Sequence, residues 1–339
     1  MTVQCIVHVL IPELFAYHTL VTPGLRLEAL ERLLSRAYIE DWAQDDFMST
    51  LGLLFGLAGN SLLPVAPITR LYDAHDSQNA VWLRADPVYL QADRDRLLLI
   101  DAQAISLTQT EAEYFITHLN QFYQQKNFEF SAPHPKRWYL RLSELPQLIT
   151  YPVNQVLGRD IHAYMPSGDD KMAWRQRLNE IQMLLHQLPL NSERQQQAQL
   201  PINSVWFWGL GHLPSPPARR WAHVWSDNPL ACGLAELTQT PVATVPHHGR
   251  EWLTQLTAGE HLLTLEAALT TPQNWNEWLI TLDNQWLNPL FEALKRRQID
   301  MLALYPCYEK VFVMTPERLR HWWRKRQHWQ RFFPAPPPS

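Results

Sequence analysis

Residues 203–212 read Asn203-Ser204-Val205-Trp206-Phe207-Trp208-Gly209-Leu210-Gly211-His212. The bulky apolar run is typical of a buried β-strand, and the Gly-x-Gly pair indicates a tight turn directly after it. Backbone N–H groups at such a turn can bind an anion, although glycine beside two tryptophans also suits a purely structural turn. The pattern predicts an anion or phosphometabolite site formed by Asn203, Ser204, Trp206, Trp208, Gly209, Gly211 and His212.

Strand-like and helix-like segments alternate on both sides of this run. Helical spacing covers residues 25–37, 169–188, 250–256 and 274–297, and strand-like segments include 3–11, 261–265, 301–304 and 311–314. This alternation predicts an α/β fold with a mixed sheet covered by helices. The turn-rich stretch 146–166 predicts two lobes, residues 1–165 and 166–333, followed by a loose Pro-rich tail at 334–339.

The composition limits the function classes. The chain has 339 residues, 46% hydrophobic and 18% charged, so it can bury a large core. Its formal charge of −4 argues against a dedicated nucleic-acid binder. Three scattered cysteines, Cys5, Cys232 and Cys307, cannot form a disulfide framework, so we expect reduced thiols and a cytoplasmic location. No apolar run reaches the length of a transmembrane segment.

Several histidines and carboxylates have competing interpretations. His247 and His248 follow a strand, but neighbouring side chains on an extended segment point in opposite directions, so a half-exposed loop is favoured over a shared metal. We expect His186, on the apolar helix 169–188, to be a buried structural residue, with a ligand contact as the alternative. The group Asp86, Asp93 and Asp95 alternates with arginines, which predicts a salt-bridged hairpin.

The basic, tryptophan-rich stretch 318–332 is predicted to be a C-terminal helix. Leu319, Trp322, Trp323 and Trp329 repeat at helical spacing, which favours a helix that docks its tryptophans into the core. The alternative is a surface that binds a membrane or single-stranded nucleic acid.

Several stretches of the chain, together with residues 203–212, match the sequence pattern of one known family. The helix contains Glu180-Ile181-Gln182-Met183-Leu184-Leu185-His186, and elsewhere stand Ala85-Asp86-Pro87-Val88-Tyr89-Leu90, Asp93-Arg94-Asp95-Arg96-Leu97, Trp225-Ser226-Asp227-Asn228-Pro229 and Gly233-Leu234-Ala235. Together they resemble the RpfE-type regulatory proteins of bacteria. Members of that family are often labelled putative cofactor-independent phosphoglycerate mutases.

A more distant resemblance links the chain to the archaeal-type phosphoglycerate mutases of the alkaline-phosphatase superfamily. It rests on Thr22-Pro23-Gly24-Leu25-Arg26-Leu27-Glu28-Ala29-Leu30 and on the strand that leads into Gly211. The resemblance implies an alkaline-phosphatase-like core. That core is degenerate, since Ile11-Pro12-Glu13 stands where those enzymes place a metal-binding Asp-Gly, and neither Ser35 nor Ser49 has an activating context for a nucleophile.

The sequence therefore supports three hypotheses for function. The first is a non-catalytic regulatory or ligand-sensing protein without a cofactor, whose partners are a small phosphorylated ligand and a regulatory protein. The second is a phosphoglycerate mutase or metal-dependent phosphohydrolase, with Mn or Zn held by Glu13, Asp227, His247 and His248. The third is a protein-interaction module that uses its tryptophan-rich surface.

Overall fold

The computed structural model describes residues 4–12, 14–15, 21–57, 63–76, 80–124, 128–267, 274–320 and 325–333. The chain divides into two compact units: unit 1 is Met1–Asn60 with Pro216–Ser339, and unit 2 is Ser61–Ser215. These bounds differ from the boundary expected at 165/166. The turn-rich stretch that suggested a boundary instead forms α5 (Val153–Val156) and a 3₁₀ turn (Ile161–Tyr164) inside unit 2.

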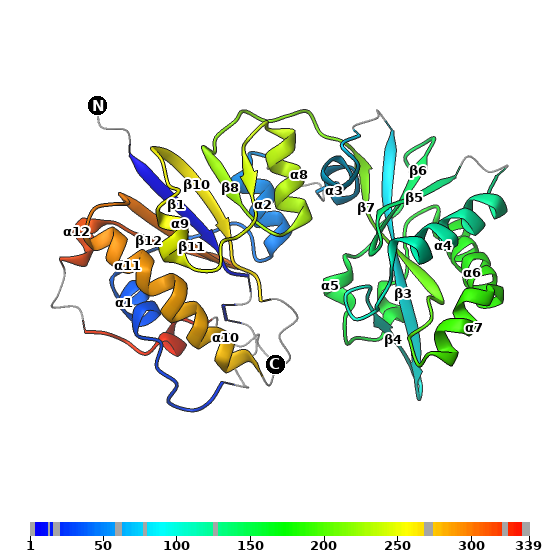
Figure 1. The fold of residues 1–339 in the computed structure, drawn as a ribbon, viewed down its shortest axis with the longest axis horizontal. Helices are drawn as coiled ribbons and strands as arrows, with labels where there is room; N and C mark the ends of the chain where they lie inside the picture. The colour runs from blue at the N-terminus through cyan, green and yellow to red at the C-terminus, as the bar shows by residue number, and fades with distance from the viewer. Residues whose placement is uncertain are drawn as a thin grey trace. The chain divides into compact units, whose positions relative to one another are not determined.

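Unit 1 is built on a seven-stranded sheet in the order β2-β12-β11-β1-β10-β8-β9 (Figure 1). Its strands are β1 (Cys5–Leu10), β2 (Tyr38–Asp41), β8 (His223–Trp225), β9 (Val242–Ala243), β10 (Gly259–Thr264), β11 (Met301–Tyr308) and β12 (Lys310–Met314). The five strands from β11 to β9 are parallel, and β12 and β2 are antiparallel additions at one edge. The carboxyl ends of the parallel strands therefore meet at one edge, where sheets of this kind bind ligands.

Helices cover both faces of the unit 1 sheet (Figure 1). Val7, Val9 and Ile11 of the β1 segment pack in one core with α1 (Glu28–Arg36), α9 (Gly249–Leu253), α10 (Trp275–Leu282) and α11 (Asn288–Lys295). The other face carries α2 (Phe47–Leu54) and α8 (Pro229–Leu237). The long helix expected at 274–297 is interrupted by a π-helical turn, Asp283–Leu287, because Pro289 has no N–H for a regular i→i−4 bond.

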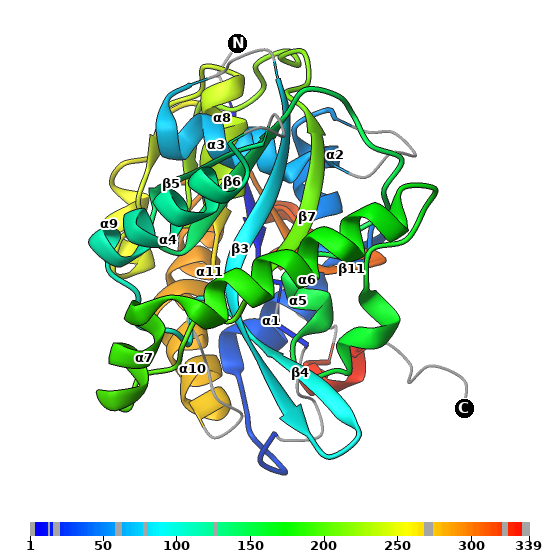
Figure 2. The same cartoon turned by 90° about the vertical axis from the view of Figure 1, so that its right-hand side faces the viewer.

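Unit 2 has its own antiparallel sheet, in which β3 is central. The strands are β3 (Val81–Asp93), β4 (Arg96–Ile100), β5 (Glu129–His134), β6 (Arg137–Leu142) and β7 (Ser204–His212), with β7 paired to β3. One face packs against α4 (Gln109–Phe122) and α6 (Lys171–Gln187), which cross in front of the sheet in Figure 2. The other face carries α3 (Val65–Ala74). The prediction of mixed sheets flanked by helices is confirmed.

One local prediction in unit 2 is wrong. His186 is exposed rather than buried, because the buried side of α6 is formed by Trp174, Leu178, Ile181 and Leu185. The glutamine-rich stretch after α6 forms the helix α7 (Pro189–Gln196). Its Arg194 side chain is 2% exposed and donates to Glu111 and to the carbonyl oxygens of Ser106 and Leu200.

The predicted C-terminal helix is much shorter than expected. Helix α12 covers only Pro316–Leu319, and residues 329–332 form a 3₁₀ turn. Trp329 is fully buried and its indole N–H donates to the carbonyl oxygen of Leu25, so this tryptophan packs in the core as predicted. Trp322 and Trp323 lie outside the described residues, as does the Pro-rich tail at 334–339. None of the described helices has the length and apolar character needed to cross a membrane.

Candidate ligand site

The predicted Gly-x-Gly turn is part of a strand. Both glycines lie within β7, where a bulge sets residues 209 and 210 opposite Leu83. Gly209 has φ +69°, and a Cβ there would lie 3.1 Å from the backbone N of Ala66 on α3. A Cβ on Gly211 would lie 2.6 Å from the Cβ of Pro64. The glycines are thus required for the close approach of α3 to β7, and the expected turn is corrected to a bulge.

The side chains of the predicted glycine site are used largely by the fold of unit 2. The amide of Asn203 continues the strand pairing, since it accepts from the N–H of Leu90 and donates to its carbonyl oxygen. His212 is exposed at the end of β7. The remaining contacts are Ser204 Oγ with Gln182, the Trp206 indole with the carbonyl oxygen of Tyr151, and the Trp208 indole with Asp86. Ligand binding at these residues stays a prediction.

Trp208 belongs to a buried charged network between α3 and the sheet. The guanidinium of Arg84 donates twice to the carboxylate of Asp86, at 2.9 and 2.8 Å, and the Trp208 indole donates to the same carboxylate at 2.8 Å. Arg84 and Asp86 are 4% and 6% exposed. Arg96 and Asp93 form a second, exposed pair at 3.0 Å. The expected salt-bridged hairpin is therefore present, with one of its pairs buried.

The residues of the metal hypothesis do not form one ligand set. Glu13 lies outside the described residues. His247 is exposed, and His248 Nδ1 accepts from the N–H of Glu251 as the N-cap of α9. Within the described ranges, no three His, Cys, Asp or Glu side chains gather as a metal site would require.

Asp227 instead lies in a polar cluster at the carboxyl edge of the unit 1 sheet. Ser226, Asp227 and Asn228 follow β8, and Glu266 follows β10, the neighbouring parallel strand. Asn228 caps α8 through the N–H of Leu230 and donates at 2.8 Å to Glu266. Asp227 accepts from the N–H of Val245 at 3.2 Å. Two carboxylates therefore flank Asn228, and we call residues 226–228 with Thr264 and Glu266 the carboxyl-edge cluster.

The floor of the carboxyl-edge cluster is a pair of hydroxyls. Ser226 Oγ and Thr264 Oγ1 lie 2.6 Å apart, and each residue is 2% exposed. Ser226 Oγ also accepts from the N–H of Asn228. Since the two hydroxyls bond to one another below the surface, they fix the ends of β8 and β10 rather than present a free nucleophile.

A second polar group of unit 1, the His8 network, lies on the opposite face of the sheet from Val7. His8 is 2% exposed, its Nδ1 lies 3.0 Å from the Tyr305 hydroxyl, and its Nε2 lies 3.2 Å from Glu260. His8 and Arg220 together lower the pKa of Glu260 to about 2, whereas burial lowers the pKa of His8. The hydrogen bond between His8 Nδ1 and Tyr305 ties β1 to β11, and the close approach of His8 Nε2 to Glu260 links β1 to β10.

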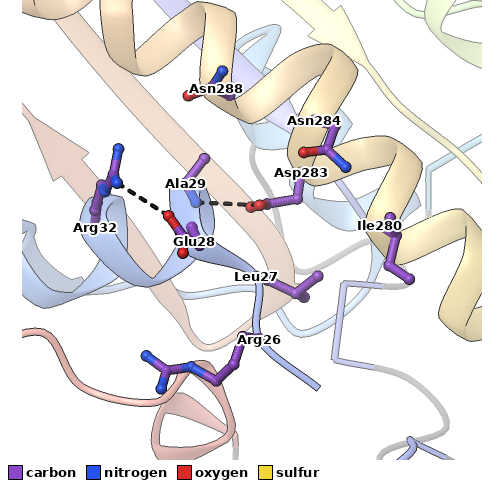
Figure 3. A pocket seen from close by; sticks show the side chains of 9 residues that line it. All are labelled: Arg26, Leu27, Glu28, Ala29, Arg32, Ile280, Asp283, Asn284 and Asn288. Atoms are coloured by element: carbon purple, nitrogen blue, oxygen red, sulfur yellow. Dashed lines mark hydrogen bonds and ion pairs between the residues drawn. The ribbon is translucent and has the colours of Figure 1, made fainter. Parts of the chain in front are cut away.

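A polar pocket of about 240 Å³ lies where α1 meets the π-helical turn (Figure 3). Asp283 accepts from the N–H groups of Ala29 and Leu30 at 3.2 and 2.7 Å, so its carboxylate caps α1. Burial raises the pKa of Asp283. Arg32 on the opposite wall is paired with Glu28. The pocket contains none of the predicted site residues, and its Asp283 links α1 to the π-helical turn.

Sequence reasoning found Asp227 but missed Glu266, Thr264 and the His8 network. The signal for Glu266 was an acidic residue directly after a buried strand, at the end where parallel sheets bind ligands. That signal identifies a site next to Asp227 only if β8 and β10 are neighbours. This pairing joins residues about forty positions apart in the chain.

Comparisons with known proteins place the fold. No family model matches the chain. Among solved structures, the PH0037 protein of Pyrococcus horikoshii superimposes with a TM-score of 0.53 at 13% identity, covering 92% of this chain and 87% of the other. A cofactor-independent phosphoglycerate mutase from Thermoplasma acidophilum gives a TM-score of 0.44 at 14% identity. The chain thus has a mixed α/β fold that resembles the fold of the PH0037 protein.

Curated relatives match only segments of the chain. The 2,3-bisphosphoglycerate-independent phosphoglycerate mutase of Methanothrix thermoacetophila is 32% identical over 66 residues, which are 20% of this chain and 17% of that protein. A probable enzyme of the same name from Geobacter sulfurreducens is 24% identical over 138 residues, or 40% and 34%. The matched segments thus span about a third or less of these relatives. The expected likeness to phosphoglycerate mutases is confirmed at this level, whereas membership of the RpfE-type family stays a prediction.

Proposed function

We propose that this chain is a ligand-sensing protein that binds a phosphorylated metabolite at the carboxyl-edge cluster without transferring the phosphoryl group. The observation that carries the proposal is the position of Asp227 and Glu266, which flank Asn228 at the carboxyl ends of two neighbouring parallel strands. The sequence likeness of segments of this chain to phosphoglycerate mutases supports a phosphorylated ligand.

Electrostatics then determine the form in which the ligand binds. A bare phosphate beside two carboxylates would be repelled, because all of these groups are negative near neutral pH. Mg²⁺ is commonly held by one or two protein carboxylates together with the phosphate oxygens of a ligand and water. We therefore expect the metabolite to bind as its Mg²⁺ or Mn²⁺ complex, with Asp227 and Glu266 facing the cation.

The hydroxyl groups at this edge support binding of the metabolite without transfer of its phosphoryl group. A covalent phosphoryl transfer needs a nucleophile that is accessible and activated by a neighbouring base or metal. Ser226 and Thr264 are buried and bond to each other, and Ser49 donates to Asp46 in the cap of α2. A regulatory partner and an interaction surface remain predictions beside this function.

Thermal unfolding of the full chain tests the proposal. With 3-phosphoglycerate and Mg²⁺ both at millimolar concentration, we expect the melting temperature to rise. With either alone we expect it to stay near its starting value, because the carboxylates repel the free phosphate and the free cation finds too few protein ligands here. Glu266→Gln should abolish the shift, and Glu251→Gln on α9, an exposed carboxylate of the same unit, should keep it. No stabilisation by 3-phosphoglycerate with Mg²⁺ or Mn²⁺ would refute the proposal.

A second candidate function is phosphoglycerate mutase activity. The observation that favours it is the activity named for the curated relatives, which share 32% identity with this chain over 66 residues in one case. The two candidates share the ligand class and differ in whether product forms.

A further inference from the structure

Two histidines on neighbouring parallel strands face each other at the edge of the unit 1 sheet. His223 on β8 and His261 on β10 are register partners, so both side chains lie on the same face of the sheet as Val7, which is paired with His261. His261 is fully buried. This face is opposite to the one that carries His8 and Glu260, so Glu260 does not neutralise the pair.

The hydrogen bonds of His261 fix its protonation state. Its Nε2 lies 2.7 Å from the carbonyl oxygen of Thr257, and because a carbonyl only accepts, Nε2 must carry the proton. Nδ1 then carries no proton, and it is buried without a hydrogen-bond partner. A proton added at Nδ1 would create a buried imidazolium whose new N–H has no acceptor.

His223 is half-buried, but one of its ring nitrogens is in a similar environment. Its Nε2 is also buried without a partner, and its ring stacks on Trp225 at 4.1 Å. Burial lowers the pKa of both histidines, and each added charge would repel the other. The two rings are therefore neutral near neutral pH and resist protonation.

Among the residues that the structure describes, the groups that face the pair from neighbouring elements offer no counter-charge. β1 contributes Val7, β9 is paired with β8 through Val242 and Ala243, and α9 contributes Trp252, whose ring lies 5.4 Å from Trp225. The charged residues of α9, Arg250 and Glu251, are exposed. Cys5, two residues before Val7 on β1, is a further titratable side chain on this face, and burial raises the pKa of its thiol.

The strands that carry the pair are joined by a short ladder. β8 is held to β10 by three register pairs, at His223, Val224 and Trp225, and β9 is held to β8 by two. β8 and β9 form the end of the sheet, where short ladders open at a lower free energy than central strands. We propose that His223 and His261 form an acid-sensitive latch, which releases the β8–β9 edge from β10 when both are protonated.

The sign of the pH dependence follows from the buried neutral state. The opened edge binds protons with the ordinary histidine pKa of about 6.5, and the closed edge binds them only at lower pH. Closure is therefore fully favourable above about pH 6.5 and weakens as the pH falls below it, by up to about tenfold per pH unit for each histidine. Ser226 directly follows β8, so opening would also displace the carboxyl-edge cluster, a consequence that rests on the proposed function.

Hydrogen exchange of the full chain without any ligand tests the latch apart from the proposed function. After correction for intrinsic rates, peptides covering residues 222–245 should lose protection by at least about tenfold between roughly pH 7 and roughly pH 5. Peptides from β11 should keep theirs. In the double variant His223→Phe and His261→Gln, which preserves the ring stack and the donor to Thr257, residues 222–245 should show little pH dependence.

Matched controls separate the latch from general acid effects. His247→Gln, an exposed histidine of unit 1, should leave the wild-type pH response unchanged. NMR titration provides a second reading, in which the ring signal that disappears in the single variant His261→Gln should titrate below the ordinary range. Equal loss of protection in β11 and residues 222–245, or a wild-type response that survives in the double variant, would overturn the proposal.

Discussion

Asp86 is a charged residue that is buried in unit 2. Its carboxylate accepts from Arg84, from the Trp208 indole and from the backbone N–H of Trp138. Removing the carboxylate by Asp86→Ala leaves the Arg84 charge buried and uncompensated, which should lower the free energy of unfolding of unit 2 by roughly 3–5 kcal/mol. Urea unfolding of the full chain measures this loss.

The exposed pair of the same hairpin provides the control. Asp93 and Arg96 lie 3.0 Å apart with side chains 41% and 56% exposed, so Asp93→Ala should cost no more than about 1 kcal/mol. Similar losses of unfolding free energy in Asp86→Ala and Asp93→Ala would show that burial does not determine how much an ion pair contributes to stability. The alternation of Asp and Arg predicted that these residues pair, but which pair is buried depends on α3, which packs over Arg84 through Thr69.

At the scale of elements, the contact between α3 and β7 depends on Gly209. A methyl group there would lie 3.1 Å from both the backbone N of Ala66 and the Cβ of Val65, at a residue with φ +69°. We expect Gly209→Ala to destabilise unit 2 by roughly 2–4 kcal/mol, from the left-handed backbone and the overpacking together. Equilibrium denaturation with a probe of unit 2 measures the loss.

Gly158 separates the two causes. It has φ +72°, and a Cβ at this position would meet no other atom within 4 Å, so Gly158→Ala should lose only the backbone contribution of roughly 1–2 kcal/mol. A loss at Gly209 no larger than that at Gly158 would contradict close packing of α3 as the reason for the glycine. The sequence predicted the strand and the need for glycine, but not the bulge, because the residue opposite it comes from β3, more than a hundred positions earlier.

At the scale of the whole molecule, local patterns predicted the α/β class but not the division of the chain. Periodicity reports which segments are helices and strands, and those assignments largely hold for β1, α1, α6 and β10. Unit 1 is discontinuous because β1 pairs with β10 and β11, whose residues lie more than 250 positions away. No local signal encodes that pairing, and the irregular stretch at 146–166 suggested a boundary that belongs inside unit 2.

The most direct test of whether the ligand is bound without reaction is an assay of mutase activity. It measures conversion of 3-phosphoglycerate to 2-phosphoglycerate by the full chain in the presence of Mn²⁺. The carboxyl-edge cluster contains two carboxylates and two hydroxyls, and the two hydroxyls bond to each other. We therefore predict turnover at the background rate. The same preparation should still be stabilised against heat by 3-phosphoglycerate with the metal. Metal-dependent turnover that is lost in both Glu13→Ala and Glu266→Gln, while Glu251→Gln keeps it, would contradict this account and establish the chain as a mutase.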